Sequence, residues 1–139
     1  MYAISMMQPY AWLFCRGYLT IDDRSRSTAI RGPVAIHASK RFHEPYYEFI
    51  RKRINWPLPE IQELEYGGIV GVADLVDCLA ASPQGAKPDL RRAHFGAQGF
   101  HGFVFKNPRF QTLIPYRGNV GFFQVPDDVV TVGARCPAF

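Results

Sequence analysis

The chain has 139 residues, of which 47% are apolar and 14% aromatic, and its formal net charge is +4. This size and apolar content predict a single domain over residues 1–139, with residues 127–139 as a C-terminal tail. No apolar run approaches the roughly 20 residues that a membrane helix needs, and no signal peptide opens the sequence. We therefore expect a soluble, cytoplasmic protein that does not act on a membrane.

Cysteine spacing argues against two further classes of protein. Cys15, Cys78 and Cys136 are odd in number and far apart, and none belongs to a Cys-x-x-Cys pair. This pattern indicates neither a disulfide framework nor a zinc site. We expect no metal and no cofactor, and we favour a monomer.

Two short strands and a helix are predicted at the start of the chain. Residues 2–6 predict a strand, and Gln8-Pro9 then begins a helix, because proline is tolerated in the first helical turn. Gly17 ends that helix. Residues 19–24 alternate apolar and polar side chains, which is typical of a second strand.

Residues 31–40 predict a third strand that ends in polar side chains. A Gly-Pro turn leads into the small apolar run 34–36, and His37, Ser39 and Lys40 follow it. Because side chains alternate along a strand, His37 and Ser39 should point to one face and Lys40 to the other. We therefore do not expect His37 and Lys40 to share a face.

Strand signals dominate the rest of the chain. After a predicted helix at 44–54, the elements expected are a long strand at 67–79, an exposed loop at 80–101, and short strands at 102–106, 110–114 and 121–125. An Asn107-Pro108 turn should separate the first two of these short strands. The total of about six strands and two main helices predicts an α+β fold with a mixed, partly closed β-barrel.

Six segments of the sequence occur in a characteristic order. They are Gln8-Pro9-Tyr10-Ala11-Trp12, Gly17-x-x-Thr20-Ile21-Asp22-x-Arg24, Arg31-Gly32-Pro33-x-x-Ile36-His37-Ala38-Ser39-Lys40, Ile69-Val70-Gly71-Val72-Ala73-Asp74-Leu75-Val76-Asp77-Cys78, Asn107-Pro108, and Gly118-x-x-Gly121-Phe122-Phe123-x-Val125-Pro126. In this order they resemble the ASCH domain family over nearly the whole chain. The resemblance implies a PUA-like β-barrel, related to RNA-binding domains. It also implies a cleft beside the polar end of the third strand.

Basic residues gather around the implied cleft. Twelve of the sixteen basic residues are arginines, and the window between Asp23 and Glu44 contains five basic residues and no carboxylate. Guanidinium groups suit phosphates, and an aromatic side chain can stack on a base. We therefore predict that single-stranded RNA binds in this cleft. The expected binding residues are Gln8, Tyr10, Thr20, Asp22, Arg24, Arg31, Lys40, Arg117 and Asn119.

Two enzymatic alternatives stay open at this point. In a metal-independent ribonuclease, Lys40 would stabilise charge on the scissile phosphate, and His37, Ser39 or a tyrosine such as Tyr46 or Tyr47 would move protons. The resemblance also implies a nucleoside amidohydrolase, since one branch of the family acts on acetylated cytidine. That branch uses the lysine of a Gly-x-Lys-Thr motif, which is replaced here by Leu19. The missing amine disfavours the amidohydrolase.

Overall fold

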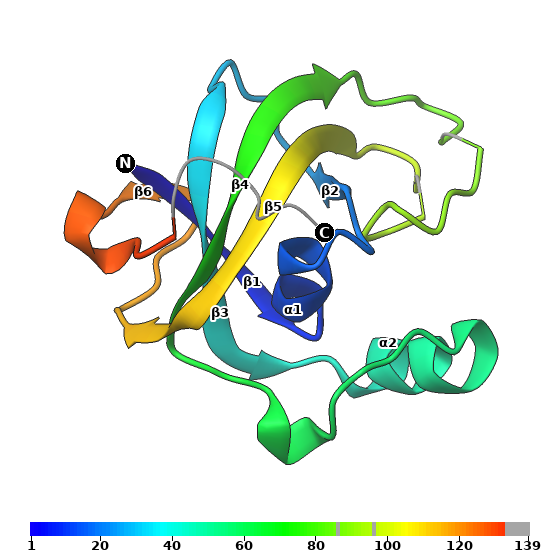
Figure 1. Ribbon diagram of the computed structural model, residues 1–139. Coiled ribbons are helices and arrows are strands. Elements are labelled where there is room, and N and C mark those ends of the chain that lie inside the picture. The colour runs from blue at the N-terminus through cyan, green and yellow to red at the C-terminus, as the bar shows by residue number, and fades with distance from the viewer. Residues whose placement is uncertain (86, 96, 133–139) are drawn as a thin grey trace.

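A mixed sheet of six strands forms the body of the molecule (Figure 1). The computed structural model describes residues 1–85, 87–95 and 97–132. The strands are β1 (Tyr2–Gln8), β2 (Ile21–Arg24), β3 (Gly32–Phe42), β4 (Gly68–Leu79), β5 (His101–Pro115) and β6 (Phe122–Gln124). They lie in the order β2-β5-β4-β3-β1-β6, with β1 and β3 parallel and the other neighbours antiparallel. The predicted mixed α+β fold is confirmed.

Two main helices accompany the sheet. The first, α1 (Tyr10–Cys15), lies on the concave side of the curved sheet (Figure 1). Its Phe14 ring contacts Phe105 of β5 edge-on, with centroids 5.9 Å apart. The second, α2 (Glu44–Phe49), continues as the π-helical segment η1 (Ile50–Ile54). Short 3-10 turns, η2 (Ile61–Glu63) and η3 (Asp127–Val129), complete the described elements.

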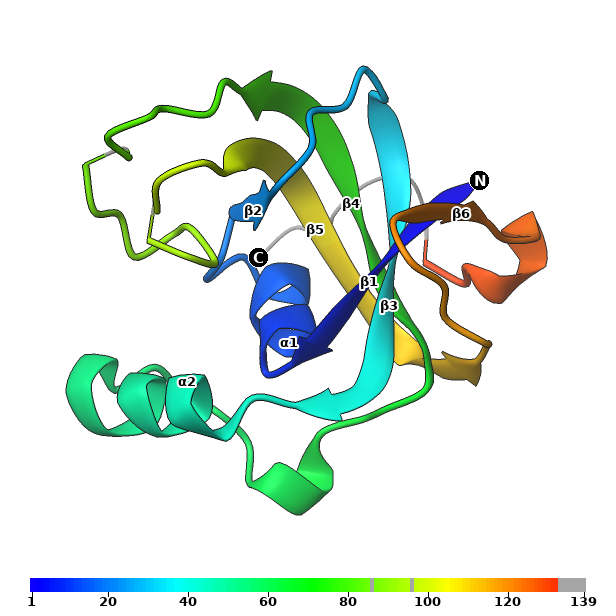
Figure 2. The same ribbon diagram turned by 180° about the vertical axis from the view of Figure 1, so that it is seen from behind.

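The sheet curls until its far parts meet, but it does not close. Phe103 of β5 and Phe122 of β6 are four strands apart in the sheet, which in a flat sheet means about 19 Å. Their rings stack with centroids only 5.8 Å apart. Figure 2 shows the resulting partly open barrel from behind. The two edge strands, β2 and β6, therefore face each other across an open seam.

The prediction of two strands separated by a turn at Asn107-Pro108 is wrong. One continuous strand, β5, runs through both residues and pairs with β4 along its length. In place of the predicted turn, the strand contains a bulge: the register slips between Val72 and Asp74 of β4, and Asn107 has a φ of 53°. A bulge tolerates the proline because one residue there leaves the ladder of hydrogen bonds. Pairing with a long neighbour thus outweighs the local turn signal.

The first part of the expected C-terminal tail is tied to the sheet. The Gln111 side chain donates a hydrogen bond to the Val129 carbonyl (2.9 Å) and accepts one from the Thr131 amide (2.9 Å). Residues 133–139 of that tail lie outside the described residues. None of the helices in the described part of the chain has the length and apolar character needed to cross a membrane.

Candidate nucleic-acid interface

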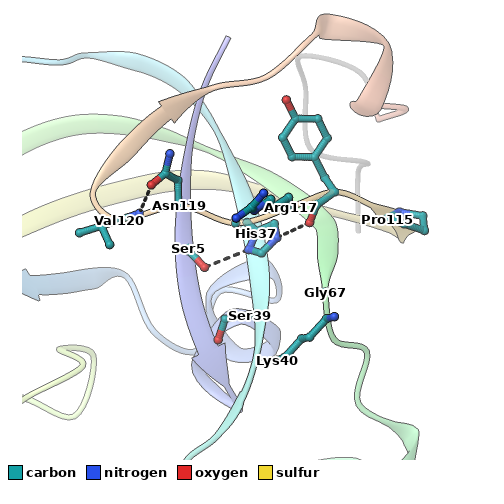
Figure 3. Close-up of a pocket in the computed structure, with 11 residues that line it drawn as sticks. Ser5, His37, Ser39, Lys40, Gly67, Pro115, Arg117, Asn119 and Val120 are labelled. Carbon is teal, nitrogen blue, oxygen red and sulfur yellow. Dashed lines mark hydrogen bonds between the residues drawn. The ribbon is translucent and has the colours of Figure 1, made fainter.

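Three adjoining hollows lie around residues 4–7 of β1 and the loop between β5 and β6. The first, called here the loop hollow, has a volume of about 900 Å³ and lies between β3 and that loop (Figure 3). Its lining is Ser5, His37, Ser39, Lys40, Gly67, Pro115, Tyr116, Arg117, Gly118, Asn119 and Val120. The predicted residues from the end of β3 and from the β5–β6 loop therefore do come together.

Irregular pairing of β3 brings Lys40 to the same hollow as His37. The register with β4 slips between Ile36 and His37. Against β1, Ala38 pairs with Met6 but Phe42 pairs with Gln8, so three residues of β3 stand opposite one of β1. Extra residues in a strand break the strict alternation of faces. His37 and Lys40 therefore both line the loop hollow, although strict alternation along β3 would separate their side chains.

His37 fixes the loop rather than facing an open site. The residue is only 2% exposed, and its Nε2 lies 2.7 Å from the Tyr116 carbonyl oxygen, which can only accept a hydrogen bond. Nε2 therefore carries the proton, and in the neutral ring Nδ1 accepts from the Ser5 hydroxyl at 2.9 Å. A Cβ on Gly118 would come within 2.6 Å of the imidazole Cε1 atom, so only glycine allows the loop to lie this close.

The cations of the loop hollow have no counter-charge. Lys40 and Arg117 are exposed, and among the described residues neither forms an ion pair or a side-chain hydrogen bond. The Lys40 stem lies along Gly67, whose Cβ position is 3.3 Å from the lysine Cε. No carboxylate occurs among the described residues of the lining. These two groups are free to meet an anion.

The second hollow, the ring hollow, combines aromatic rings with one buried ion pair. It measures about 390 Å³ and is lined by Ser5, Met6, Met7, Tyr10, Asp22, Asp23, Arg24, Ser25, Arg41, Ala93, His94 and Phe100. The His94 and Phe100 rings stack at 5.0 Å. Burial, with the nearby Asp22 carboxylate, raises the pKa of Tyr10 to about 12, so its hydroxyl keeps its proton at neutral pH.

Asp22 and Arg24 form the polar end of the ring hollow. The Arg24 guanidinium donates from Nε to Asp22 Oδ2 (2.7 Å) and from Nη2 to the Ser5 carbonyl (2.9 Å). Burial raises the pKa of the Asp22 carboxyl, and Arg24 opposes that rise. Asp22 and Arg24 therefore form an ion pair. Asp22 Oδ1 has no hydrogen-bond donor within the described part of the chain.

A buried ion pair holds the long 80–100 connection against this hollow. Arg92 donates to Asp23 Oδ1 at 2.6 Å, and the His94 amide donates to Asp23 Oδ2 at 3.0 Å. The Ala93 amide adds a bond to the Ile21 carbonyl (2.9 Å). Both charged side chains are less than a tenth exposed. This anchor places His94 in the lining of the ring hollow.

The third hollow, the seam hollow, occupies the gap between the two edge strands. It measures about 580 Å³ and is lined by Ile4, Arg24, Ser25, Arg26, Ser27, Phe103, Val120, Gly121 and Phe122. It shares Arg24 with the ring hollow and Val120 with the loop hollow, and Ser5 links the loop and ring hollows. The three hollows therefore form one continuous surface.

Three predicted binding residues lie outside this surface. Gln8 is buried, accepting from the Trp12 amide (3.0 Å) and donating to the Glu65 carbonyl (2.8 Å). Thr20 lines none of the three hollows, and its amide binds the Arg91 carbonyl (2.9 Å). Arg31 donates to nearby loop carbonyls, including Ile30 at 2.8 Å. The sequence predicted a single cleft, whereas the structure has a set of adjoining hollows. Gln8, Thr20 and Arg31 line none of them.

Several residues of the surface were not predicted. They are Ser5, Arg26, Arg41, His94 and Phe100. Arg26 and Arg41 belong to the carboxylate-free basic window, so charge alone could have indicated them. His94 and Phe100 stand in a loop whose position depends on the Asp23–Arg92 pair, and no local pattern marks them.

The fold of the chain is similar to that of solved ASCH structures. No model of a known protein family matches the chain. Its structure is similar to the crystal structure of ASCH from Zymomonas mobilis, with a TM-score of 0.57 and 12% identity, over 92% of this chain and 89% of the other. A mutant of the Zymomonas mobilis protein matches with a TM-score of 0.56 and 11% identity, over 92% of this chain and 91% of the other. The resemblance to ASCH domains predicted from the sequence is confirmed in the fold.

A relative is also found by sequence. Mouse (Mus musculus) activating signal cointegrator 1 is 28% identical over 142 aligned residues, which cover 96% of this chain. The alignment spans only 24% of the mouse protein. This chain therefore corresponds to about a quarter of that relative.

Proposed function

We propose that this domain binds single-stranded RNA on the surface formed by the loop, ring and seam hollows. The observation that carries the proposal is the charge of that surface. Its cations are Arg24, Arg26, Lys40, Arg41 and Arg117, whereas its only carboxylates among the described residues, Asp22 and Asp23, are buried in ion pairs. A polyanion gains attraction along the whole surface and meets no exposed negative charge.

Shape supports a single strand over a duplex. The ring hollow is small, and stacked rings and the buried Asp22 carboxylate lie in it, which suits one unpaired base. Asp22 Oδ1 can accept a hydrogen bond from a base amino or imino group. The exposed lysine and arginines around it suit the phosphates on either side. The choice of RNA over DNA rests on the ASCH resemblance.

The side chains expected to move protons in a ribonuclease are either hydrogen-bonded within the protein or buried. Both ring nitrogens of His37 are hydrogen-bonded within the protein, and Ser39 Oγ accepts from the Arg41 amide (3.2 Å). Tyr47 is fully buried and donates to the Pro59 carbonyl (2.6 Å). The Tyr46 hydroxyl has no hydrogen-bond partner among the described residues, but it is buried, and its ring stacks on Tyr10 at 4.4 Å. These contacts favour binding without cleavage.

The amidohydrolase alternative has less support. Leu19 stands where the enzymatic branch has its lysine, and it is only 1% exposed within the hydrophobic core. An apolar side chain packed in the core offers neither a nucleophile nor a base.

The decisive experiment is a binding titration against salt. Labelled single-stranded RNA is titrated with wild-type protein and with Lys40→Ala and Arg117→Ala, and anisotropy is measured at several salt concentrations. Each variant should bind more weakly. The slope of log affinity against log salt, which is negative, should become less steep by about 0.7 for each phosphate that the variant no longer neutralises. Lys52→Ala is the matched control, because Lys52 lies on η1 and pairs with Glu48 at 3.0 Å.

Three outcomes would contradict the proposal. These are no wild-type affinity for any single-stranded oligonucleotide, affinity that does not depend on salt, and equal losses in Lys40→Ala and Lys52→Ala. Single-stranded DNA in the same titration tests the choice of RNA. Incubating the RNA with EDTA tests the ribonuclease alternative: cleavage that persists in EDTA and disappears in Lys40→Ala would establish an enzyme instead.

A further inference from the structure

A fourth hollow lies on the other side of the β5–β6 loop from the loop hollow. It has a volume of about 550 Å³ and is lined by Tyr116, Arg117, Gly118, Asn119, Phe123 and Gln124. We call it the platform hollow. Four of its six residues, 116–119, also line the loop hollow, so one short segment forms a wall of both.

Two aromatic rings line this hollow among polar side chains. The rings of Tyr116 and Phe123 are nearly parallel, with an interplanar angle of 17° and centroids 6.4 Å apart. Both side chains are partly exposed. Around them stand the guanidinium of Arg117 and the side-chain amides of Asn119 and Gln124, and no carboxylate occurs among the described lining residues.

The platform is held in place from behind. Phe123 is fixed on β6 by pairing with Ala3 of β1, and its ring meets the His37 imidazole edge-on at 5.8 Å. The same imidazole binds the Tyr116 carbonyl oxygen through Nε2 at 2.7 Å. One buried side chain therefore orients the segments that carry both rings. Fixed rings lose little conformational entropy when a ligand stacks on them.

We propose that Tyr116 and Phe123 form a second stacking site, for an unpaired base of the same RNA strand that occupies the loop hollow. The inference rests on the proposed function. Arg117 lines both hollows and binds the phosphate between the two parts of the strand. Aromatic rings accept any base by stacking, and an adjacent guanidinium supplies the phosphate contact, the combination found in single-strand binding sites.

This arrangement makes affinity depend on the length of the strand. A short oligonucleotide occupies the loop and ring hollows alone, whereas a longer one crosses the β5–β6 loop and reaches the platform. Wild-type affinity should therefore rise in a step at the length that first spans the loop.

The test measures binding of oligouridines from about two to about twelve nucleotides, a range that covers the usual single-strand site sizes. Tyr116→Leu and Phe123→Leu keep an apolar side chain but remove the ring face. Each should abolish the step and weaken binding of the longest oligonucleotides by roughly 5- to 150-fold, as expected for the loss of one stacked base. Binding of the shortest ones should be unchanged in Phe123→Leu, because Phe123 lines none of the loop, ring and seam hollows.

Phe110→Leu is the matched control, since Phe110 is an exposed aromatic residue of β5 that lines none of the four hollows. As a second readout, a fluorescent base analogue placed along the oligonucleotide should be quenched on wild-type protein at one position, and Tyr116→Leu should relieve that quenching. This readout stands even if Phe123→Leu fails to fold.

The outcomes separate the two proposals. If wild-type protein binds RNA but both leucine variants bind every length as wild type does, the platform is not a base site, and the proposed function stands. The same conclusion follows if wild-type affinity shows no step with length. If wild-type protein binds no oligonucleotide, the proposed function itself fails.

Discussion

The loop hollow and the ring hollow adjoin at Ser5, but the first contains exposed, unpaired cations among the described residues and the second contains a buried ion pair. In the loop hollow, Lys40 and Arg117 are exposed, and no described residue pairs with them. In the ring hollow, Asp22 is buried and bonded to Arg24. Exposed charges attract a polyanion at long range and are screened by salt, whereas a buried pair offers fixed donors and acceptors at short range. Under the proposed function, the loop hollow would supply affinity and the ring hollow selectivity.

The largest expected effect comes from breaking the anchor behind the ring hollow. Arg92→Met leaves the buried Asp23 carboxylate without its cation, and removing one partner of a buried pair costs about 3–5 kcal/mol in free energy of unfolding. Urea denaturation measures the loss. The neighbouring Arg91→Met is the control, because Arg91 pairs with Asp89 at the surface and should change stability little. Equal effects of the two variants would show that the Asp23–Arg92 pair is not the anchor.

A smaller effect is expected where the loop touches His37. Gly118→Ala places a Cβ 2.6 Å from the imidazole Cε1, and such overpacking costs about 1–3 kcal/mol. Relief of that contact should displace the segment that carries Arg117, so RNA affinity should fall together with stability. Asn119→Ala, on the same loop, should leave the free energy of unfolding unchanged. An unchanged denaturation curve for Gly118→Ala would contradict the close packing.

The free energy of unfolding should depend on pH through Asp22 in the ring hollow. Burial raises the pKa of the Asp22 carboxyl above its ordinary 3.8, so the folded protein keeps the proton where the unfolded chain has lost it. The free energy of unfolding of wild type, relative to Asp22→Asn, should therefore fall as pH rises from 3.8 through the folded-state pKa, and stay constant above it. Urea denaturation of both proteins across this range measures the difference. A rise instead would mean that Arg24 outweighs burial.

The smallest structural effect is expected at the unpredicted cations. Arg26→Ala and Arg41→Ala remove exposed side chains, so thermal melting should be unchanged. RNA affinity should nevertheless fall. The dependence of log affinity on log salt should become less steep by about 0.7 for each phosphate that the variant no longer neutralises. Arg53→Ala, an exposed arginine on η1, should alter neither quantity. If it weakens binding equally, the attraction belongs to net charge rather than to this surface.

Local sequence patterns predicted most strands because each is a short apolar or alternating run. They failed where a neighbour decides the geometry. Asn107-Pro108 carries a turn signal, but pairing with β4 keeps the strand continuous. The extra residues of β3 between Ala38 and Phe42 depend on its register with β1, which the sequence of β3 alone does not indicate.

The site was predictable as far as its charges are contiguous in sequence. The basic window from Arg24 to Arg41 contains four of the five cations of the three hollows; it misses Arg117, and its Arg31 lies outside them. The contribution of His94 could not be predicted, because it depends on an ion pair between Asp23 and Arg92, which are 69 residues apart. Long-range pairs of this kind leave no periodic pattern in a single sequence.

The short edge strand β6 should open before the centre of the sheet. It pairs with β1 at only three positions, from Tyr2–Gln124 to Ile4–Phe122, and its other side borders the seam. Elements with few backbone bonds open locally at a lower free-energy cost than central strands such as β4. Amide hydrogens of residues 122–124 should therefore exchange with solvent before those of β4. A bound strand of RNA should slow that exchange. Amide exchange at residues 122–124 would therefore measure whether RNA is bound.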